Sequence, residues 1–198
     1  MARYTVVITG ASGSAYGMRA VEQLLAAGHE VALIMTEAGR GVTAPELDFE
    51  LPAEDPARAV LRFLESPLDA PLRVACCKDI FDPLASGSYP VDGMLIIPAS
   101  MGFCASVAAG LASTLPERAA DVMLKERRPL VFVPRETPLS LVHLRNLTTL
   151  AEAGAAIVPA MPAFYNQPES LDDQVNYVVG KALDVLGVEH DLFERWGA

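Results

Sequence analysis

The sequence predicts an α/β fold, a Rossmann-like, flavodoxin-type parallel sheet that lies between two layers of helices. Short apolar runs rich in β-branched residues recur along the chain, and segments of helix length separate each run from the next. The runs are apolar throughout instead of alternating with polar residues. Strands of this kind are typical of a parallel sheet whose two faces are both covered by helices.

The first elements are a strand, a glycine turn and a helix. Residues 4–9 (Tyr-Thr-Val-Val-Ile-Thr) form a β-branched run that ends at Gly10. Residues 16–27 have the apolar spacing of a helix, which stops at Gly28. Further strands are predicted over residues 30–35, 94–97, 130–133 and 156–158.

The middle and the end of the chain complete this pattern. Between Pro45 and Pro90 the strand and helix signals weaken, and we expect an excursion with a helix over residues 56–64 and a functional loop. A last helix is predicted to begin after Ser170, with an apolar stripe from Leu171 to Leu186. We expect a single domain over residues 1–198, whose C-terminal tail, residues 187–198, packs on a neighbouring subunit.

Charge and composition exclude several classes of protein. The formal net charge is −10, and no run of Lys and Arg offers a surface for a nucleic-acid backbone, so nucleic-acid binding is not expected. No apolar run reaches the ~18 residues that a membrane span needs, and the N-terminus lacks the pattern of a signal peptide. Because 52% of so short a chain is hydrophobic, we expect a homo-oligomer.

The cysteines and histidines predict neither a disulfide framework nor a metal site. Cys76, Cys77 and Cys104 are odd in number and two of them are adjacent, which favours a cytoplasmic protein. The histidines have no metal-ligand spacing. The serine-hydrolase pattern G-x-S-x-G is also absent from the sequence.

Two loops at predicted strand ends contain small and hydroxyl residues that would let a ligand approach a helix N-terminus. Residues 9–14 (Thr-Gly-Ala-Ser-Gly-Ser) follow the first strand, and residues 98–104 (Pro-Ala-Ser-Met-Gly-Phe-Cys) follow the strand over 94–97. In a doubly wound sheet both loops lie at the carboxyl ends of strands, where ligands bind. We expect one shared anionic ligand there; the alternative for residues 9–14 alone is a plain tight turn.

Other polar residues are predicted at the same edge of the sheet. Thr36 follows the second strand, either as a ligand contact or as a helix cap. Arg135 and Glu136 follow the strand over 130–133, and an arginine suits bidentate phosphate binding. Glu136 is either a proton acceptor or a surface partner of Arg135. Ser86 lies in a Ser-Gly-Ser tract, which is either a lid or an ordinary loop.

The ordered set of motifs resembles the UbiX/Pad1-like flavin prenyltransferase family over nearly the whole chain. Each motif alone is weak, and their combination is specific. The segments that carry the resemblance are residues 9–13 (TGASG), 85–88 (ASGS), 117–122 (ERAADV), 124–128 (LKERR), 133–138 (VPRETP) and 162–165 (PAFY).

The resemblance implies a flavoprotein that binds FMN between subunits of a homododecamer. It implies transfer of a dimethylallyl group from its phosphate or diphosphate to N5 of reduced FMN, with ring closure at C6. The prenylated FMN would serve a UbiD-type decarboxylase. FMN would contact Gly10, Ala11, Ser12, Thr36, Ser100, Met101, Gly102, Phe103 and Arg135. The prenyl phosphate would meet Ser86, Arg118, Lys125, Arg135, Glu136, Tyr165 and Lys181.

The same resemblance implies catalytic roles. Ser12, Glu46 and Glu136 would manage the proton that is lost as the rings form. Trp196, in the tail, would present an aromatic face to the allylic cation.

Two positions depart from the family pattern. Lys181 stands where many relatives carry Arg, which keeps the positive charge and loses the bidentate fork. Thr36 and Glu37 stand where several relatives have Ser-Lys, so that the hydroxyl is kept and the charge is reversed.

Two other functions are weighed against this one. A flavin-dependent cysteine decarboxylase of the related fold would carry an early catalytic histidine and a Pro-x-Met-Asn motif, but residues 159–162 read Pro-Ala-Met-Pro. A non-catalytic FMN-binding subunit would not need a second phosphate site. The joint presence of Lys125, Arg135, Glu136, Tyr165 and Trp196 argues against it.

Overall fold

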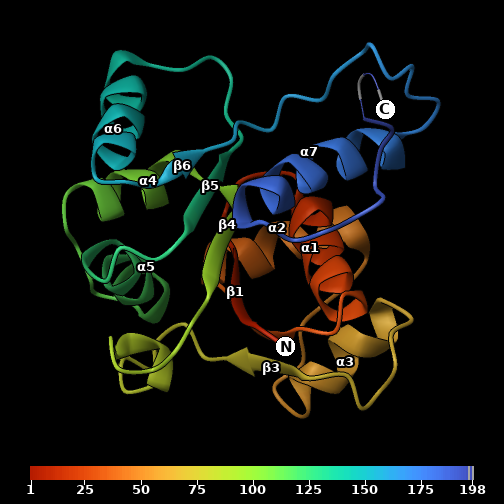
Figure 1. Cartoon of the computed structure of the whole chain (residues 1–198). Coiled ribbons are helices and arrows are strands. Elements are labelled where there is room, and N and C mark those ends of the chain that lie inside the picture. The colour runs from red at the N-terminus through yellow and green to blue at the C-terminus, as the bar shows by residue number, and fades with distance from the viewer. Residues whose placement is uncertain (196, 198) are drawn as a thin grey trace.

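The computed structural model, which describes residues 1–195 and 197, has a six-stranded parallel sheet in the order β3-β2-β1-β4-β5-β6 (Figure 1). This is the Rossmann strand order, and without the edge strand β3 the other five strands have the flavodoxin order, so the predicted fold class is confirmed. The strands are β1 (Arg3–Ile8), β2 (Glu30–Met35), β3 (Leu72–Ala75), β4 (Gly93–Ala99), β5 (Leu130–Pro134) and β6 (Ala156–Ile157).

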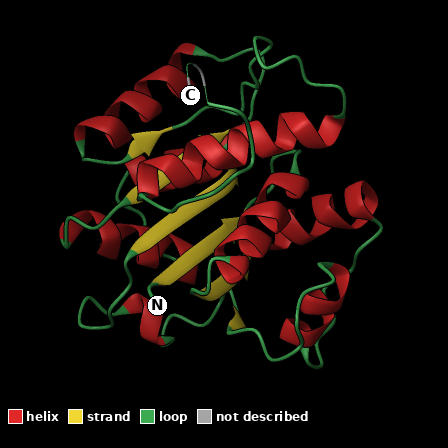
Figure 2. Cartoon of the chain, turned by 45° about the vertical axis from the view of Figure 1, so that its right-hand side comes forward, coloured by secondary structure: helices red, strands yellow, loops and turns green. Residues whose placement is uncertain are grey.

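Helices cover both faces of the sheet (Figures 1 and 2). One layer contains α1 (Ser14–Ala26), α3 (Pro56–Phe63) and α7 (Leu171–Leu186), with α2 (Glu37–Leu47) beside α1. The other layer contains α4 (Met101–Ala108), α5 (Leu115–Lys125), α6 (Leu141–Glu152) and the short 3-10 helix η1 (Pro83–Ala85).

The apolar strands form this sandwich because successive side chains point to opposite faces. Val6 and Ile8 pack in the core under α1 and α7, whereas Val7 packs in the core under α4 and α5. Every residue of β4 is buried. Continuous apolar runs therefore became central strands, as expected.

The structure contains two elements that the sequence did not predict, strand β3 and helix α2. Strand β3 has four residues, pairs only with β2 and buries only Ala75 fully, so it lacks the apolar run that marks the central strands. Helix α2 contains Pro45 and two glycines, which weaken a helix signal. It forms because Thr36 caps its first turn and the helix packs against α1.

The C-terminal region differs from expectation at Leu171. This side chain was predicted to belong to the apolar stripe of α7, but it is 76% exposed because it stands at the first turn, beyond the edge of the core. The stripe begins at Val175 instead.

The described part of the tail runs back along α7 of its own chain. A Cβ atom on Gly180 would lie 2.5 Å from the ring of Phe193, so the absence of a side chain at position 180 lets the tail approach. The His190 ring lies 3.2 Å from the Asp184 carboxylate, and Arg195 also binds Asp184. Packing of residues 187–198 on a neighbouring subunit, like the single-domain boundary, stays a prediction.

Candidate functional site

Because all six strands are parallel, the loops that follow β1, β2, β4 and β5 lie at one edge of the sheet. We call this the carboxyl edge. The strand order reverses between β1 and β4, and crevices at such a point bind ligands in doubly wound folds.

Two hydroxyl residues at the carboxyl edge cap helices. The Oγ1 atom of Thr36 accepts a hydrogen bond from the Gly39 N–H at 2.9 Å, and Oγ of Ser100 accepts one from the Phe103 N–H at 3.3 Å. The sequence left two roles open for Thr36, ligand contact or helix cap, and the structure has it as a helix cap. The N-termini of α2 and α4, which these residues cap, lie at the carboxyl edge. The partial positive charge of a helix N-terminus favours an anion there.

The N-terminus of α1 already holds an anion from the chain itself. The Glu46 carboxylate accepts hydrogen bonds from the Gly13 N–H at 3.0 Å and from the Ser14 N–H at 2.9 Å. Burial raises the pKa of Glu46, but hydrogen bonds from the Ser12 hydroxyl and from these N–H groups outweigh it and hold the pKa below its ordinary value. A phosphate at the same N–H groups would face this charge, so the loop suits a flavin edge better than a phosphate.

Ser12 and Glu46, two of the predicted catalytic residues, therefore lie in contact, whereas Glu136 comes from the loop after β5. The Glu136 carboxylate is exposed and accepts a hydrogen bond from the Thr137 N–H at 2.9 Å. Among the described residues it forms no ion pair with Arg135. The structure therefore does not have Glu136 as a surface partner of Arg135, which was one of its two expected roles.

Arg135 places a guanidinium nitrogen in a buried position at this edge. Its Nε atom has no hydrogen-bond acceptor in the part of the chain that the structure describes, although its backbone N–H donates to Ala99 O at 3.3 Å. A buried donor without an acceptor is costly in a folded protein. An anionic ligand at the carboxyl edge would satisfy it, and this fits the expected FMN and phosphate contacts.

Tyr16 was not predicted and lies at this site. Its ring packs over Gly13, where an added Cβ would come within 2.7 Å of it. Burial raises the pKa of Tyr16, and the charge of Arg135 partly offsets this rise. Its position in an apolar-spaced helix made it resemble a core residue, so the sequence held no signal that separated it from the core.

The side chains of Met101 and Phe103 contribute to the core instead of the edge. They are 5% and 8% exposed and pack among the residues between the sheet and α4 and α5. Gly102 is open, with no atom near the place of an added Cβ. For these three expected FMN contacts, the backbone of the first turn of α4 is the part that faces the edge. Gly10 and Ala11 lie in the loop after β1, where Gly10 fits closely against Ala38.

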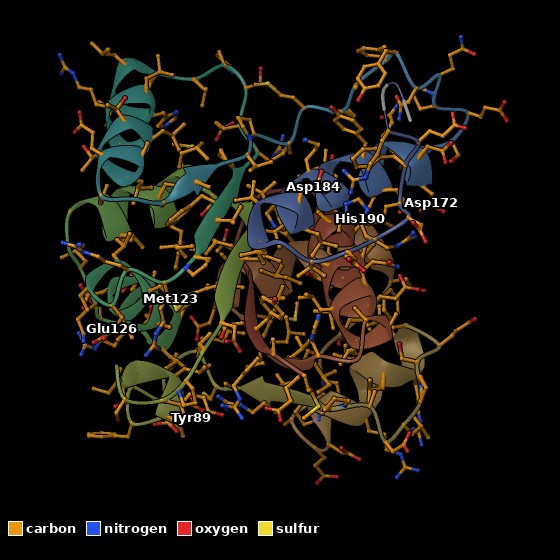
Figure 3. All side chains as sticks on the ribbon, viewed as in Figure 1. Tyr89, Met123, Glu126, Asp172, Asp184 and His190 are labelled. Atoms are coloured by element: carbon orange, nitrogen blue, oxygen red, sulfur yellow. The ribbon has the colours of Figure 1, made fainter. Side chains whose placement is uncertain are left out.

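A second group of predicted residues lies at the opposite, amino edge of the sheet. The Arg118 Nε atom donates to Ala85 O at 3.2 Å, next to Ser86, and Lys125 forms an ion pair with Glu126. Arg128 donates to Gly87 O at 2.7 Å and lies two residues before the start of β5, while the loop that contains Gly87 leads into β4. Figure 3 labels Tyr89 and Glu126 in this region, away from Asp184 on α7.

A third group surrounds α7. Lys181 lies 3.5 Å from the Asp184 carboxylate, and the rings of Tyr165 and Tyr177 are 6.1 Å apart. Contact with Tyr165 raises the pKa of Tyr177. Trp196, the predicted aromatic contact, lies outside the described residues. Within one chain, the fold therefore unites the FMN residues and leaves the predicted phosphate residues in separate groups.

Residues 1–195 and 197 offer no metal site, and one of their thiols, Cys104, is buried. No group of three or more His, Cys, Asp and Glu side chains there is arranged to hold a metal ion. Burial raises the pKa of the Cys104 thiol to about 12, so it is not a thiolate. In the same residues, no helix has the length and apolar character required to cross a membrane.

The flavoprotein family model matches residues 1–183. Flavin prenyltransferase UbiX of Halalkalibacterium halodurans is 50% identical over 194 residues, which are 98% of this chain and 93% of the relative. The structure of AnUbiX (PadA1) in complex with FMN and dimethylallyl pyrophosphate has a TM-score of 0.88 and 36% identity, and the match covers 100% of this chain and 98% of that one.

Two further solved structures bear on assembly and on the alternative function. A dodecameric FMN-dependent UbiX-like decarboxylase from Escherichia coli O157:H7 has a TM-score of 0.87 at 38% identity, covering 99% of this chain and 100% of the other. The FMN-dependent cysteine decarboxylase SpaF, at 21% identity and a TM-score of 0.56 over 80% of this chain and 84% of its own, shares the fold alone. By its sequence and its fold, this chain belongs to the flavoprotein family and, within it, to the UbiX flavin prenyltransferases.

Proposed function

We propose that this chain is a flavin prenyltransferase, which joins a dimethylallyl group from its phosphate or diphosphate to N5 and C6 of reduced FMN. The observation that carries this proposal is the likeness along the entire chain to AnUbiX, whose structure contains both FMN and dimethylallyl pyrophosphate. The product, prenylated FMN, would serve a UbiD-type decarboxylase. A cytoplasmic location rests on the cysteine content alone.

The carboxyl edge would hold the flavin. Reduced FMN supplies the nucleophilic N5 and C6 atoms. The loop after β1, the capped N-termini of α2 and α4, and Arg135 would bind and orient it. The buried Nε of Arg135 supports this assignment because it needs an acceptor that the described chain does not provide.

A second copy of the chain would complete the site. The amino edge of a sheet cannot reach the carboxyl edge of the same sheet, so Ser86, Arg118 and Lys125 would meet the flavin of another subunit. The dodecamer formed by the E. coli relative supports such an arrangement. So do the exposed apolar side chains Ile80, Phe81, Leu111, Leu141, Val142, Leu144, Met161 and Phe164, which a monomer would leave in water.

The assembled cations would promote ionisation of the allylic ester. The bond from carbon to the phosphate oxygen breaks heterolytically, which leaves negative charge on the departing phosphate. Arg118, Lys125 and Lys181, with the Tyr165 hydroxyl, would stabilise that charge as preorganised donors, while the closed interface keeps water from the cation. Trp196 would supply an aromatic face to the cation.

We assign different roles to the two glutamates. Glu46 stays ionised because its pKa is lowered, and it holds the Ser12 hydroxyl by a hydrogen bond, so it is a positioning residue. Glu136 has an exposed carboxylate at the same edge and would accept the proton that is lost as the ring closes.

Incubation with reduced FMN and either dimethylallyl phosphate or dimethylallyl diphosphate tests the function. Mass spectrometry of the released flavin should detect the addition of one dimethylallyl unit, and comparing the two donors identifies the preferred ester. An unchanged flavin with both donors would remove the proposal. A cysteine-containing peptide as a parallel substrate would detect oxidative decarboxylation, which we expect to be absent.

A further inference from the structure

Thr9 joins the ends of the two central strands through its side chain. The residue is 1% exposed and follows the last residue of β1. Its Oγ1 atom donates a hydrogen bond to Pro98 O at 2.7 Å and accepts one from the Ser100 N–H, also at 2.7 Å. A single buried hydroxyl therefore links the loop after β1 to the loop after β4.

This link stands where the regular backbone pairing ends. The β1–β4 register stops at Val7 and Ile96, and the β4–β5 register shifts between Ile96 and Ala99. Beyond the Val7–Ile96 pair, two backbone bonds cross between the loops, from the Thr9 N–H to Pro98 O and from the Arg135 N–H to Ala99 O, each 3.3 Å. The two bonds of the Thr9 hydroxyl, at 2.7 Å each, are thus shorter than these backbone bonds and lie at the point where the strand order reverses.

The consequences reach three loops of the flavin-binding edge. Ser100 caps α4, so holding its N–H sets where the first turn of α4 begins. Thr9 directly precedes Gly10 and the loop that carries Ser12. The neighbouring Ala99 carbonyl holds the backbone of Arg135. The position of one hydroxyl therefore determines the spacing between the groups that would contact the flavin.

We propose that Thr9 is a positioning residue for flavin binding, which acts by holding the loops after β1 and β4 at a fixed separation. This inference rests on the proposed function, because it assumes that the flavin occupies this edge. Thr9 does not touch the ligand in this proposal, since its hydroxyl is buried and both of its bonds are made inside the protein.

Two substitutions separate this role from ordinary core packing. Thr9→Val keeps the shape, removes the acceptor of the Ser100 N–H and leaves Pro98 O only the longer bond from the Thr9 backbone N–H, whereas Thr9→Ser keeps the hydroxyl. Thr5→Val is the matched control: Thr5 is also 1% exposed and lies on β1, four positions before Thr9 and away from the edge.

Flavin affinity and the thermal stability of the flavin-free protein are measured for all four proteins. We expect Thr9→Val to weaken FMN binding about tenfold or more, because a buried donor loses its acceptor and the loops lose their spacing. Thr9→Ser and Thr5→Val should stay within about threefold of the wild type. If Thr9→Val binds FMN as the wild type does, or if Thr5→Val weakens binding as much, the proposal is wrong.

Amide hydrogen exchange provides a measurement on the wild type that does not depend on a stable variant. The Ser100 amide should exchange slowly without FMN, and exchange at the rate of an open loop would contradict the link. Failure of the wild type to bind FMN would overturn the proposed function together with this inference. Binding by the wild type and by Thr9→Val alike would overturn the inference alone.

Discussion

The two edges of the sheet hold their polar groups in different ways. At the carboxyl edge, buried groups and helix caps support the candidate flavin residues: Thr9 is buried, Ser100 caps α4, and Nε of Arg135 is buried with no hydrogen-bond partner among the described residues. At the amino edge, the predicted phosphate-binding cations form ion pairs near the surface, Arg118 with Asp121 and Lys125 with Glu126.

This difference indicates two kinds of binding surface. Exposed ion pairs contribute little to stability, so an arriving phosphate can replace the carboxylate at little cost. Buried hydrogen bonds are harder to rearrange, because each lost partner leaves a desolvated group. The carboxyl edge is therefore a preorganised cofactor site, and the amino edge is an adaptable surface that needs a second copy to become a site.

The largest expected effect comes from removing one residue at each edge. Arg135→Ala and Lys125→Ala should each slow single-turnover prenylation by about 10²–10³-fold, because the first removes a cation assigned to the flavin and the second removes a donor assigned to the leaving phosphate. If the two edges meet between subunits, co-expression of the two variants should form mixed oligomers that regain activity. The exposed Arg145→Ala on α6 serves as a control and should remain active.

The co-expression experiment also tests the division between the edges. A chain that carries both substitutions must stay inactive when expressed alone. If the mixed oligomers are no more active than the separate variants, both residues act within one chain. That result would contradict the proposed arrangement, in which the two residues lie at opposite edges of the sheet of one chain.

Lys181→Ala should have the next largest effect. We expect prenylation to slow by about 10²-fold with flavin affinity nearly unchanged, since the side chain is assigned to the leaving phosphate. In the structure, Lys181 pairs with Asp184, and Asp184 would keep Arg195 and His190 when the lysine turns to a phosphate. Lys181→Arg should retain activity. Full activity of the alanine variant would identify Lys181 as a surface residue.

A smaller effect on stability is expected from Glu46→Gln, and it should depend on pH. Because the pKa of Glu46 is lowered by folding, its carboxylate contributes stability that is fully present above its unfolded-state pKa. That contribution is lost as the pH falls through the lower folded-state pKa. Urea unfolding should therefore distinguish the variant from the wild type at neutral pH, and the difference should shrink below about pH 4. A difference that grows on acidification would contradict this assignment.

No effect is expected from chelation of metals. Prenylation should proceed in EDTA at its original rate, because protein cations are assigned to the phosphate and residues 1–195 and 197 contain no cluster of metal-ligand side chains. Loss of activity on chelation, restored by Mg²⁺, would show that the amino-edge cations are not sufficient.

The sequence by itself determined the sheet, its central strands and the loops at its carboxyl edge. Apolar runs such as residues 30–35 report directly on burial, and their observed strand has the same bounds. Thr36 and Ser100 were found because a hydroxyl residue before a helix is a local signal. The assignment of FMN and phosphate contacts came from the family resemblance.

Only the tertiary structure decided which of these groups meet. Glu46 reaches the start of α1 from 33 positions away, and whether Nε of Arg135 has a partner among the described residues depends on the segments packed around it. The separation of Lys125 from Arg135 follows from strand direction and helix placement. Local patterns report hydrogen bonds and burial within a few residues, whereas contacts between distant segments are set by how the helices and the sheet pack together.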